Sequence, residues 1–186
     1  YEGIIGYGSN TGGFLKPMTI ALWFKKYSGS TSGTLADFGT TSEGIKLYIN
    51  GSSPYSIYAE LGSSSNILKS SYDTHTYSSA DDTSASTEWT HVVLVILPTR
   101  DYNQNMSGAR IFVNGEDRTY YSSETTRYTA RINSNISERF MIGRSIGGSD
   151  YFKGYIDDFR IYNVALSPNE IKQLYMNINT YSQVNL

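Results

Sequence analysis

Two adjacent carboxylates, Asp157 and Asp158, stand out as residues whose type and spacing suit metal chemistry. Ile156 fits one face of a strand whereas Phe159 and Ile161 fit the other, so we expect a β-bulge at the pair. A bulge would aim one carboxylate at an ion. Ca²⁺ prefers such hard oxygen ligands, and backbone carbonyls of the glycine-rich N-terminal segment would add more. The pair predicts a structural calcium site. The alternative is that one Asp accepts a hydrogen bond from a loop amide while the other is solvated.

A second candidate site consists of aromatic side chains on strand positions opposite the aliphatic face. Such rings can stack on the C–H faces of sugars, with Asn and Ser groups matching the sugar hydroxyls at the rim. We therefore consider a concave platform that binds a glycan. The competing interpretation is that loops such as residues 69–87 fold over that sheet and make it a second small core. The four rings are Trp23, Tyr48, Tyr58 and Phe112.

The stretch from residue 69 to residue 87 is almost entirely polar and predicts a long surface loop. Loops on rigid sandwiches often carry specificity, so this loop is either a recognition surface or a solvated insertion. Its candidate ligand-binding residues are Tyr72, Asp73, His75 and Tyr77.

Catalytic constellations are harder to find in the sequence. The chain has no cysteine and two histidines, and His91 follows Trp89 on an apolar strand, which favours a hydrogen-bonded core residue over a general base. No strand carries the alternating carboxylates that would flank a glycosidic bond. The N-terminal glycines match neither common nucleotide-binding motif. We therefore expect no catalytic residues and no cofactor beyond the calcium ion.

The elements that would position these residues are mostly strands, because apolar residues recur with period two until near the end of the chain. Ser167-Pro-Asn-Glu170 forms a capping box that predicts one short helix through about Tyr175. The fold class is therefore all-β, an antiparallel two-sheet sandwich with one short C-terminal helix. The expected strands cover residues 18–24, 45–49, 57–61, 89–97, 109–113, 117–121, 140–143 and 155–162.

The 186 residues suit one domain, which we assign to residues 1–176. Residues 177–186 lack a periodic pattern, and we expect them to be a C-terminal tail or a linker to a further domain. The first residue is Tyr1 rather than Met, so we expect a piece of a longer protein.

Composition restricts the partners. Lys and Arg number 15 against 17 Asp and Glu, so the chain lacks the basic surface that binds nucleic acid. The longest apolar run, residues 92–97, is far too short to enter a membrane as a helix. Only 17% of residues are charged, whereas 14% are aromatic. An uncharged, tyrosine-rich surface suits a glycan or an extracellular protein, and it suits self-association equally well.

Four segments in the later part of the chain carry a family resemblance. They read Trp-Thr-His-Val-Val from Trp89, Ala-Arg-Ile-Phe-Val-Asn-Gly from Ala109, Phe-Met-Ile-Gly-Arg from Phe140, and Gly-Tyr-Ile-Asp-Asp-Phe-Arg-Ile-Tyr from Gly154. With the following Ala-Leu-Ser-Pro-Asn-Glu-Ile helix start, the chain resembles the laminin-G-like, concanavalin-A-like lectin/glucanase jelly roll, which is related to pentraxins. The resemblance implies two packed antiparallel sheets, one of them concave. It also implies a module that binds glycans or proteins outside cells, with calcium near the carboxylate pair in many relatives.

One departure from the pentraxin pattern is visible. Arg144-Ser-Ile-Gly-Gly148 stands where pentraxins carry an acidic calcium-binding stretch, so we do not expect a pentraxin-type calcium pair.

The sequence predicts a noncatalytic carbohydrate-binding or adhesion module of a larger secreted, cell-surface or virion protein. The alternative is a structural, self-assembling domain of a virion, surface layer or extracellular filament. A polysaccharide-active enzyme of the same fold is the third reading.

Overall fold

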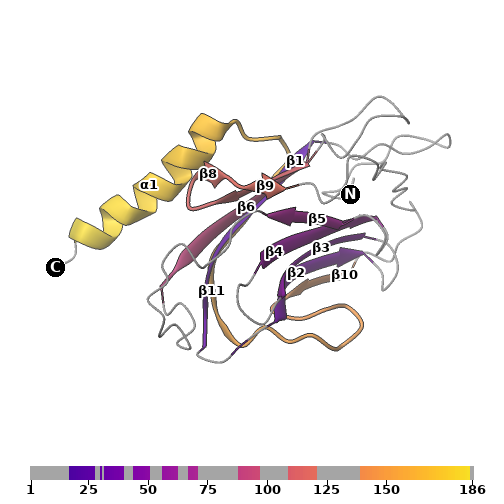
Figure 1. The fold of residues 1–186 in the computed structure, drawn as a ribbon. Coiled ribbons are helices and arrows are strands. Elements are labelled where there is room, and N and C mark those ends of the chain that lie inside the picture. The colour runs from indigo at the N-terminus through magenta and orange to yellow at the C-terminus, as the bar shows by residue number, and fades with distance from the viewer. Residues whose placement is uncertain are drawn as a thin grey trace.

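Two antiparallel sheets and a C-terminal helix make up the described part of the chain in the computed structural model (Figure 1). Among the described residues, no helix is long and apolar enough to cross a membrane. The predicted loop residues Tyr72, Asp73, His75 and Tyr77 lie outside the described residues. Those residues are 17–27, 30, 32–39, 44–50, 56–62, 67–70, 88–96, 109–120 and 139–184.

The first sheet, which we call the helix-side sheet, has the strand order β11-β1-β6-β7-β8. Its central strand β6 is buried along its whole length, as the continuous apolar run from residue 89 to residue 97 predicts. β7 and β8 are joined by the Asn114-Gly115 turn, in which both residues adopt positive φ. The strands are β1 (Met18–Lys26), β6 (Thr90–Ile96), β7 (Ala109–Val113), β8 (Glu116–Asp117) and β11 (Gly154–Tyr162).

The second sheet has the order β10-β2-β3-β4-β5-β9, and its neighbours also pair antiparallel. The predicted hairpin across Asn50-Gly51 is present as the β3–β4 pair, in full register from Gly44 opposite Gly62 to Asn50 opposite Ser56. The strands are β2 (Gly33–Gly39), β3 (Gly44–Asn50), β4 (Ser56–Gly62), β5 (Ile67–Ser70), β9 (Thr119–Tyr120) and β10 (Arg139–Ile142).

The main core lies between the two sheets. Met18, Ile20, Leu22 and Phe24 point into it from alternate positions of β1, and apolar residues of β2, β3, β6 and β7 meet them there. Burying a large aliphatic side chain stabilises the fold by roughly 1.5–3 kcal/mol, so this layer accounts for a fold without disulfides. The predicted all-β, two-sheet antiparallel sandwich is confirmed.

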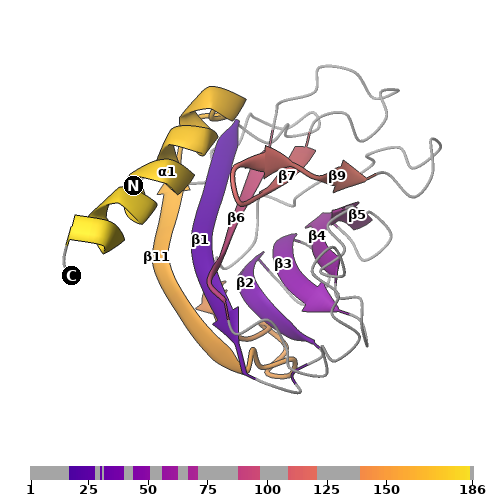
Figure 2. The ribbon, with the colours of Figure 1, turned by 60° about the vertical axis from the view of Figure 1, so that its left-hand side comes forward.

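Helix α1 (Pro168–Val184) packs on the outer face of the helix-side sheet (Figure 2). The predicted capping box is present: the Ser167 backbone N–H and hydroxyl both donate to Glu170 Oε2 at 2.7 Å, and the Glu170 N–H donates back to Ser167 Oγ at 3.4 Å. Ile171 points inward and forms a second, smaller core with Phe112, Val93 and other apolar residues.

Three local expectations were wrong. The helix does not end near Tyr175 but continues to Val184, because residues 176–184 contain no Gly or Pro to stop it. The return strand expected at residues 117–121 splits: β8 pairs with β7, whereas β9 pairs with β5 in the other sheet. Residues 69 and 70, assigned to the polar loop, belong to β5.

Strand β2 was not predicted at all. A register shift between Thr34 and Ala36 places Leu35 and Ala36 side by side in the core, which breaks the alternation of apolar and polar residues. The search for alternating apolar and polar residues therefore could not identify this strand.

Candidate functional site

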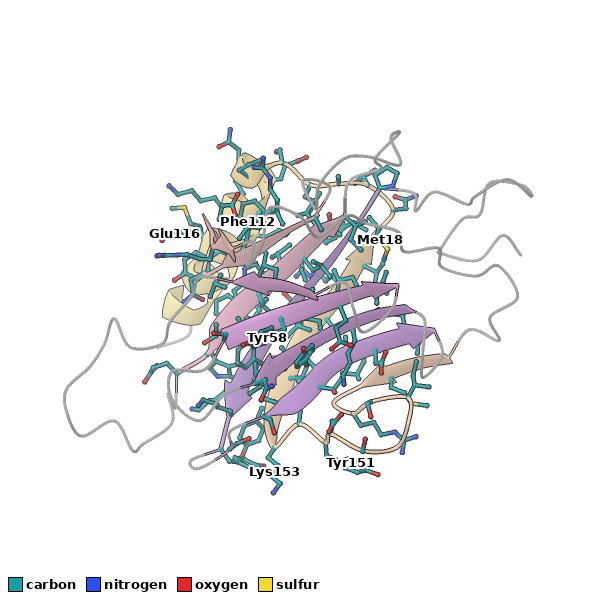
Figure 3. All side chains as sticks on the ribbon, turned by 45° about the vertical axis from the view of Figure 1, so that its right-hand side comes forward. Met18, Tyr58, Phe112, Glu116, Tyr151 and Lys153 are labelled. Atoms are coloured by element: carbon teal, nitrogen blue, oxygen red, sulfur yellow. The ribbon has the colours of Figure 1, made fainter. Side chains whose placement is uncertain are left out.

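The structure divides the four predicted platform rings into two pairs on different sheets. Trp23 and Phe112 belong to the helix-side sheet, where only 7% and 2% of their surfaces are exposed. The Trp23 ring stacks on Tyr175 of α1 at 5.6 Å, and Phe112 lies beside the helix in Figure 3. Phe112 belongs to the second small core and Trp23 is buried against Tyr175, so both rings are covered, as the alternative interpretation held. The element that covers them is α1 rather than a loop.

His91 completes the cluster beneath the helix. Its ring lies 5.0 Å from that of Trp23 and 6.1 Å from that of Tyr175. His91 is 2% exposed and its backbone N–H donates to Asn114 Oδ1, so its place in the core is confirmed. Its ring Nδ1 has no hydrogen-bond partner among the described residues, so the hydrogen bond expected of this side chain is not seen at that atom. Burial lowers the pKa of His91 to about 4, although the nearby Asp158 carboxylate opposes that shift. Its position under α1 does not suit a general base.

Tyr48 and Tyr58 form the other pair, on the outer face of the sheet without the helix. They are direct cross-strand partners of β3 and β4, and their rings stack at 5.2 Å with 14° between their planes. Leu47 and Ile49, the neighbours of Tyr48 along β3, are buried in the core. Because successive side chains of a strand point to opposite faces, Tyr48 points away from the core. Both rings are half-buried and thus partly open.

Charged side chains flank the tyrosine pair. Lys46 and Glu60 are the next cross-strand partners on the same face, and Lys46 Nζ lies 5.1 Å from the centre of the Tyr48 ring. Lys46 Nζ also pairs with Asp150 Oδ2 at 3.2 Å. We call these five residues, Lys46, Tyr48, Tyr58, Glu60 and Asp150, the β3–β4 face.

The tyrosine hydroxyl is set up as a hydrogen-bonding group. Burial and the Glu60 carboxylate raise the pKa of Tyr48 above its ordinary value, so the phenol stays protonated at neutral pH. The face therefore offers a neutral phenol that already hydrogen-bonds Glu60, one ammonium and two carboxylates beside an apolar pair of rings. That combination suits a ligand with both hydroxyl groups and apolar C–H faces.

The segment between β10 and β11 holds Asp150 next to the face. Asp37 on β2 is buried and accepts a hydrogen bond from the Ile146 N–H at 2.9 Å, and burial raises the pKa of this Asp. The Thr34 N–H donates to the Asp150 carbonyl at 2.9 Å. Sequence reasoning missed Lys46, Glu60 and Asp150. Lys46 and Glu60 stand two residues from Tyr48 and Tyr58 along their strands, which was the available signal.

The predicted bulge at the carboxylate pair is present, because the β1–β11 register shifts opposite it and Asp158 has φ of 48°. Asp157 Oδ1 accepts the Asp158 N–H, and Asp158 Oδ1 accepts Arg160 Nε, both at 2.7 Å. Within the described ranges no three His, Asp or Glu side chains gather in a way that would hold a metal. The other expected ligands fall in the N-terminal segment, outside the described residues. The pair by itself does not fit a calcium ion, and the calcium site stays a prediction.

The family model of the concanavalin A-like lectin/glucanases superfamily matches residues 9–172. Rat (Rattus norvegicus) usherin is 34% identical over 64 residues, which are 34% of this chain and 1% of usherin. The chain thus spans about a hundredth of that relative.

The solved structures that share the fold include the following two. A heptameric SAP-like pentraxin from Limulus polyphemus has a TM-score of 0.59 and 15% identity, with 91% of this chain and 73% of that chain covered. The CBM40 module of Ruminococcus gnavus IT-sialidase, bound to α2,3 sialyllactose, has a TM-score of 0.58 and 18% identity, with 86% and 83% covered. Because the family model covers most of the chain, the chain belongs to the concanavalin A-like lectin/glucanase superfamily.

Proposed function

We propose that this chain is a noncatalytic carbohydrate-binding domain of a larger, extracellular or surface-exposed protein, and that its β3–β4 face contacts the glycan. The observation that carries the proposal is the stacked pair Tyr48 and Tyr58 on the sheet that α1 leaves uncovered.

The chemistry of the face supports a sugar ligand. A pyranose has an apolar face of C–H groups and a rim of hydroxyls, so it needs both a ring surface and hydrogen-bonding groups. Tyr48 and Tyr58 supply the ring surface. Lys46, Glu60 and Asp150 supply donors and acceptors beside it. Four of these side chains come from the paired strands β3 and β4, and Asp150 is held beside them by its ion pair with Lys46. An arrangement fixed in this way before the ligand arrives would lower the entropic cost of binding.

The comparisons support the ligand class. The Ruminococcus gnavus module, which shares the fold, was solved with a sialylated glycan. The match to usherin, of which this chain covers 1%, agrees with a domain within a longer chain. A noncatalytic role agrees with the burial of His91 beneath α1, away from the β3–β4 face.

The test is a glycan array followed by titration calorimetry on the best ligand. We expect the natural chain to bind defined oligosaccharides and Tyr48→Ala or Tyr58→Ala to weaken binding at least tenfold. Tyr48→Phe keeps the ring and should retain most of the affinity. Lys172→Ala, on the exposed side of α1, is the matched control. A chain that binds no glycan and assembles with itself would overturn the proposal in favour of a structural domain.

A further inference from the structure

We propose that Asp37, a buried carboxylate on β2, is a positioning residue for the β3–β4 face, because it holds both Lys46 and the loop that carries Asp150. We call residues 144–150 the 144–150 loop. The inference rests on the proposed function and deepens it, since it names the residue that fixes the polar side of the glycan site. Asp37 is 7% exposed and bonded to the loop, so it acts through Lys46 and Asp150 rather than by touching the ligand.

Strand register places Asp37 on the outer face of the sheet, beside Lys46. Ala36 and Phe38, its neighbours along β2, belong to the main core, so Asp37 points outwards. It lies directly opposite Lys46 of β3, and Lys46 lies directly opposite Glu60 of β4. An outer row of acid, base and acid therefore crosses these strands next to the stacked tyrosines.

The 144–150 loop is tied to β2 by one side chain and by the backbone. The Ile146 N–H donates to Asp37 Oδ2 at 2.9 Å, and the Thr34 N–H donates to the Asp150 carbonyl at 2.9 Å. Figure 1 shows the loop in orange between β10 and β11, beside β2. The bond to Asp37 depends on a side chain and the other on backbone atoms alone, so a substitution can remove the first without the second.

Hydrogen bonds inside the loop join its buried and exposed parts. The Ser145 hydroxyl and N–H both donate to the Ser149 carbonyl, at 2.7 and 3.1 Å. The Gly148 N–H donates to the Ser145 carbonyl at 3.0 Å. Ser145 and Ile146 are buried, whereas residues 147–150 are exposed. An anchor at Ile146 therefore fixes the exposed part as well.

Lys46 is the residue at which the two effects of Asp37 meet. Its ammonium pairs with Asp150 Oδ2 at 3.2 Å and lies 5.1 Å from the centre of the Tyr48 ring. The Asp37 charge attracts this ammonium from the neighbouring strand, and the Ile146 hydrogen bond holds the loop that brings Asp150 to it. A ligand on the tyrosine pair would then meet a lysine and an aspartate already held in place.

The charge of Asp37 points to its role towards Lys46. Burying a carboxylate costs more free energy than burying an amide or hydroxyl that would accept the same N–H. Burial raises the pKa of Asp37, with a weaker contribution from Glu60. The Ile146 N–H and the Lys46 ammonium oppose that shift and favour the charged form. An uncharged acceptor could hold the loop but would not attract Lys46.

Amide hydrogen exchange of the folded chain without ligand tests the hold on the loop. Asp37→Ala should lower the protection of the Ile146 N–H about tenfold or more, and with it that of the Gly148 and Thr34 N–H groups, because the loop opens as a unit. Asp37→Asn keeps an acceptor and should retain most of the protection. Ile171→Ala weakens the fold beneath α1 and is the matched control, in which these amides should stay unchanged relative to those of β6.

Titration calorimetry with the best oligosaccharide from the array tests the effect on the site. Asp37→Ala should weaken binding about fivefold or more, because the ligand must then order the Lys46 and Asp150 side chains itself. Asp37→Asn restores the loop without the charge and should recover part of the loss. Ile171→Ala should bind as tightly as the natural chain, although its fold is weakened.

If Asp37→Ala does not fold, Ser145→Ala replaces it in both measurements, because it loosens the loop without touching the buried carboxylate. Loss of protection at Ile146 alone would overturn the inference, since the other bonds would then hold the loop. So would unchanged affinity in the loop variant, or an equal loss of affinity in Ile171→Ala. If no oligosaccharide binds the natural chain, the proposed function fails, whereas the exchange measurement still decides whether Asp37 holds the loop.

Discussion

Acid should destabilise this fold through His91, whose side chain is 2% exposed between Trp23 and Tyr175. Burial lowers the pKa of His91 to about 4 in the folded chain, whereas an unfolded histidine has a pKa of about 6.5. Between these values the unfolded chain binds more protons than the folded chain. The free energy of unfolding therefore falls as the pH falls from 6.5 towards 4.

The size of the effect follows from the two pKa values. Each tenfold change in proton affinity is worth about 1.4 kcal/mol, so the contribution of His91 is about 3 kcal/mol between pH 6.5 and pH 4. The charged neighbours are Asp158 and Arg160 on β11, which oppose one another in their effect on this pKa and pair at 2.7 Å. Their partial cancellation leaves burial as the dominant cause.

The assay is urea unfolding of the natural chain and His91→Gln at intervals from pH 7 to pH 4. Carboxylates such as Asp37 and Glu170 titrate in both proteins, so their effects cancel in the difference. We expect the natural chain to lose about 3 kcal/mol relative to His91→Gln over this range. Parallel curves would refute the reasoning. Should His91→Gln fail to fold, an NMR titration of the natural chain decides instead, and a His91 pKa near 6.5 would refute it.

Three further predictions concern the helix and the carboxylate pair. Ile171→Ala removes a fully buried side chain from the core beneath α1 and should cost about 2–5 kcal/mol in urea unfolding, and a loss below 1 kcal/mol would contradict the packing described. Ser167→Ala removes the helix cap and should cost about 1 kcal/mol, whereas Ser167→Thr should be nearly neutral, and equal effects would argue against the cap. If Asp157 and Asp158 help to hold calcium, EDTA should lower the Tm, and an unchanged Tm would reject the calcium site.

Much of the fold could be predicted because a strand that is buried on one side has alternating apolar and polar residues in its sequence. β3 follows that rule, β6 is buried on both sides and is recognised instead by its continuous apolar run, and the capping box at Ser167 marks the helix start. β2 was not predicted because its bulge puts Leu35 and Ala36 on the same side of the strand, which interrupts the alternation. The end of the helix was predicted wrongly because residues 176–184 contain neither a Gly or Pro stop signal nor apolar residues at a clear helical spacing.

The candidate site was harder to predict, since one sequence reveals which face of a strand a ring occupies but not what covers that face. Trp23 and Tyr48 have the same pattern locally, yet α1 covers only the first. Asp150 lies 104 residues from Lys46, so their pairing depends on the fold bringing β3 and the segment before β11 together.

Titration calorimetry of the natural chain, Tyr48→Ala and Tyr58→Ala against the best oligosaccharide from a glycan array tests the central claim most directly. The claim predicts measurable binding by the natural chain and at least a tenfold loss in each variant, with unchanged melting curves. Binding of equal strength by all three proteins would contradict it.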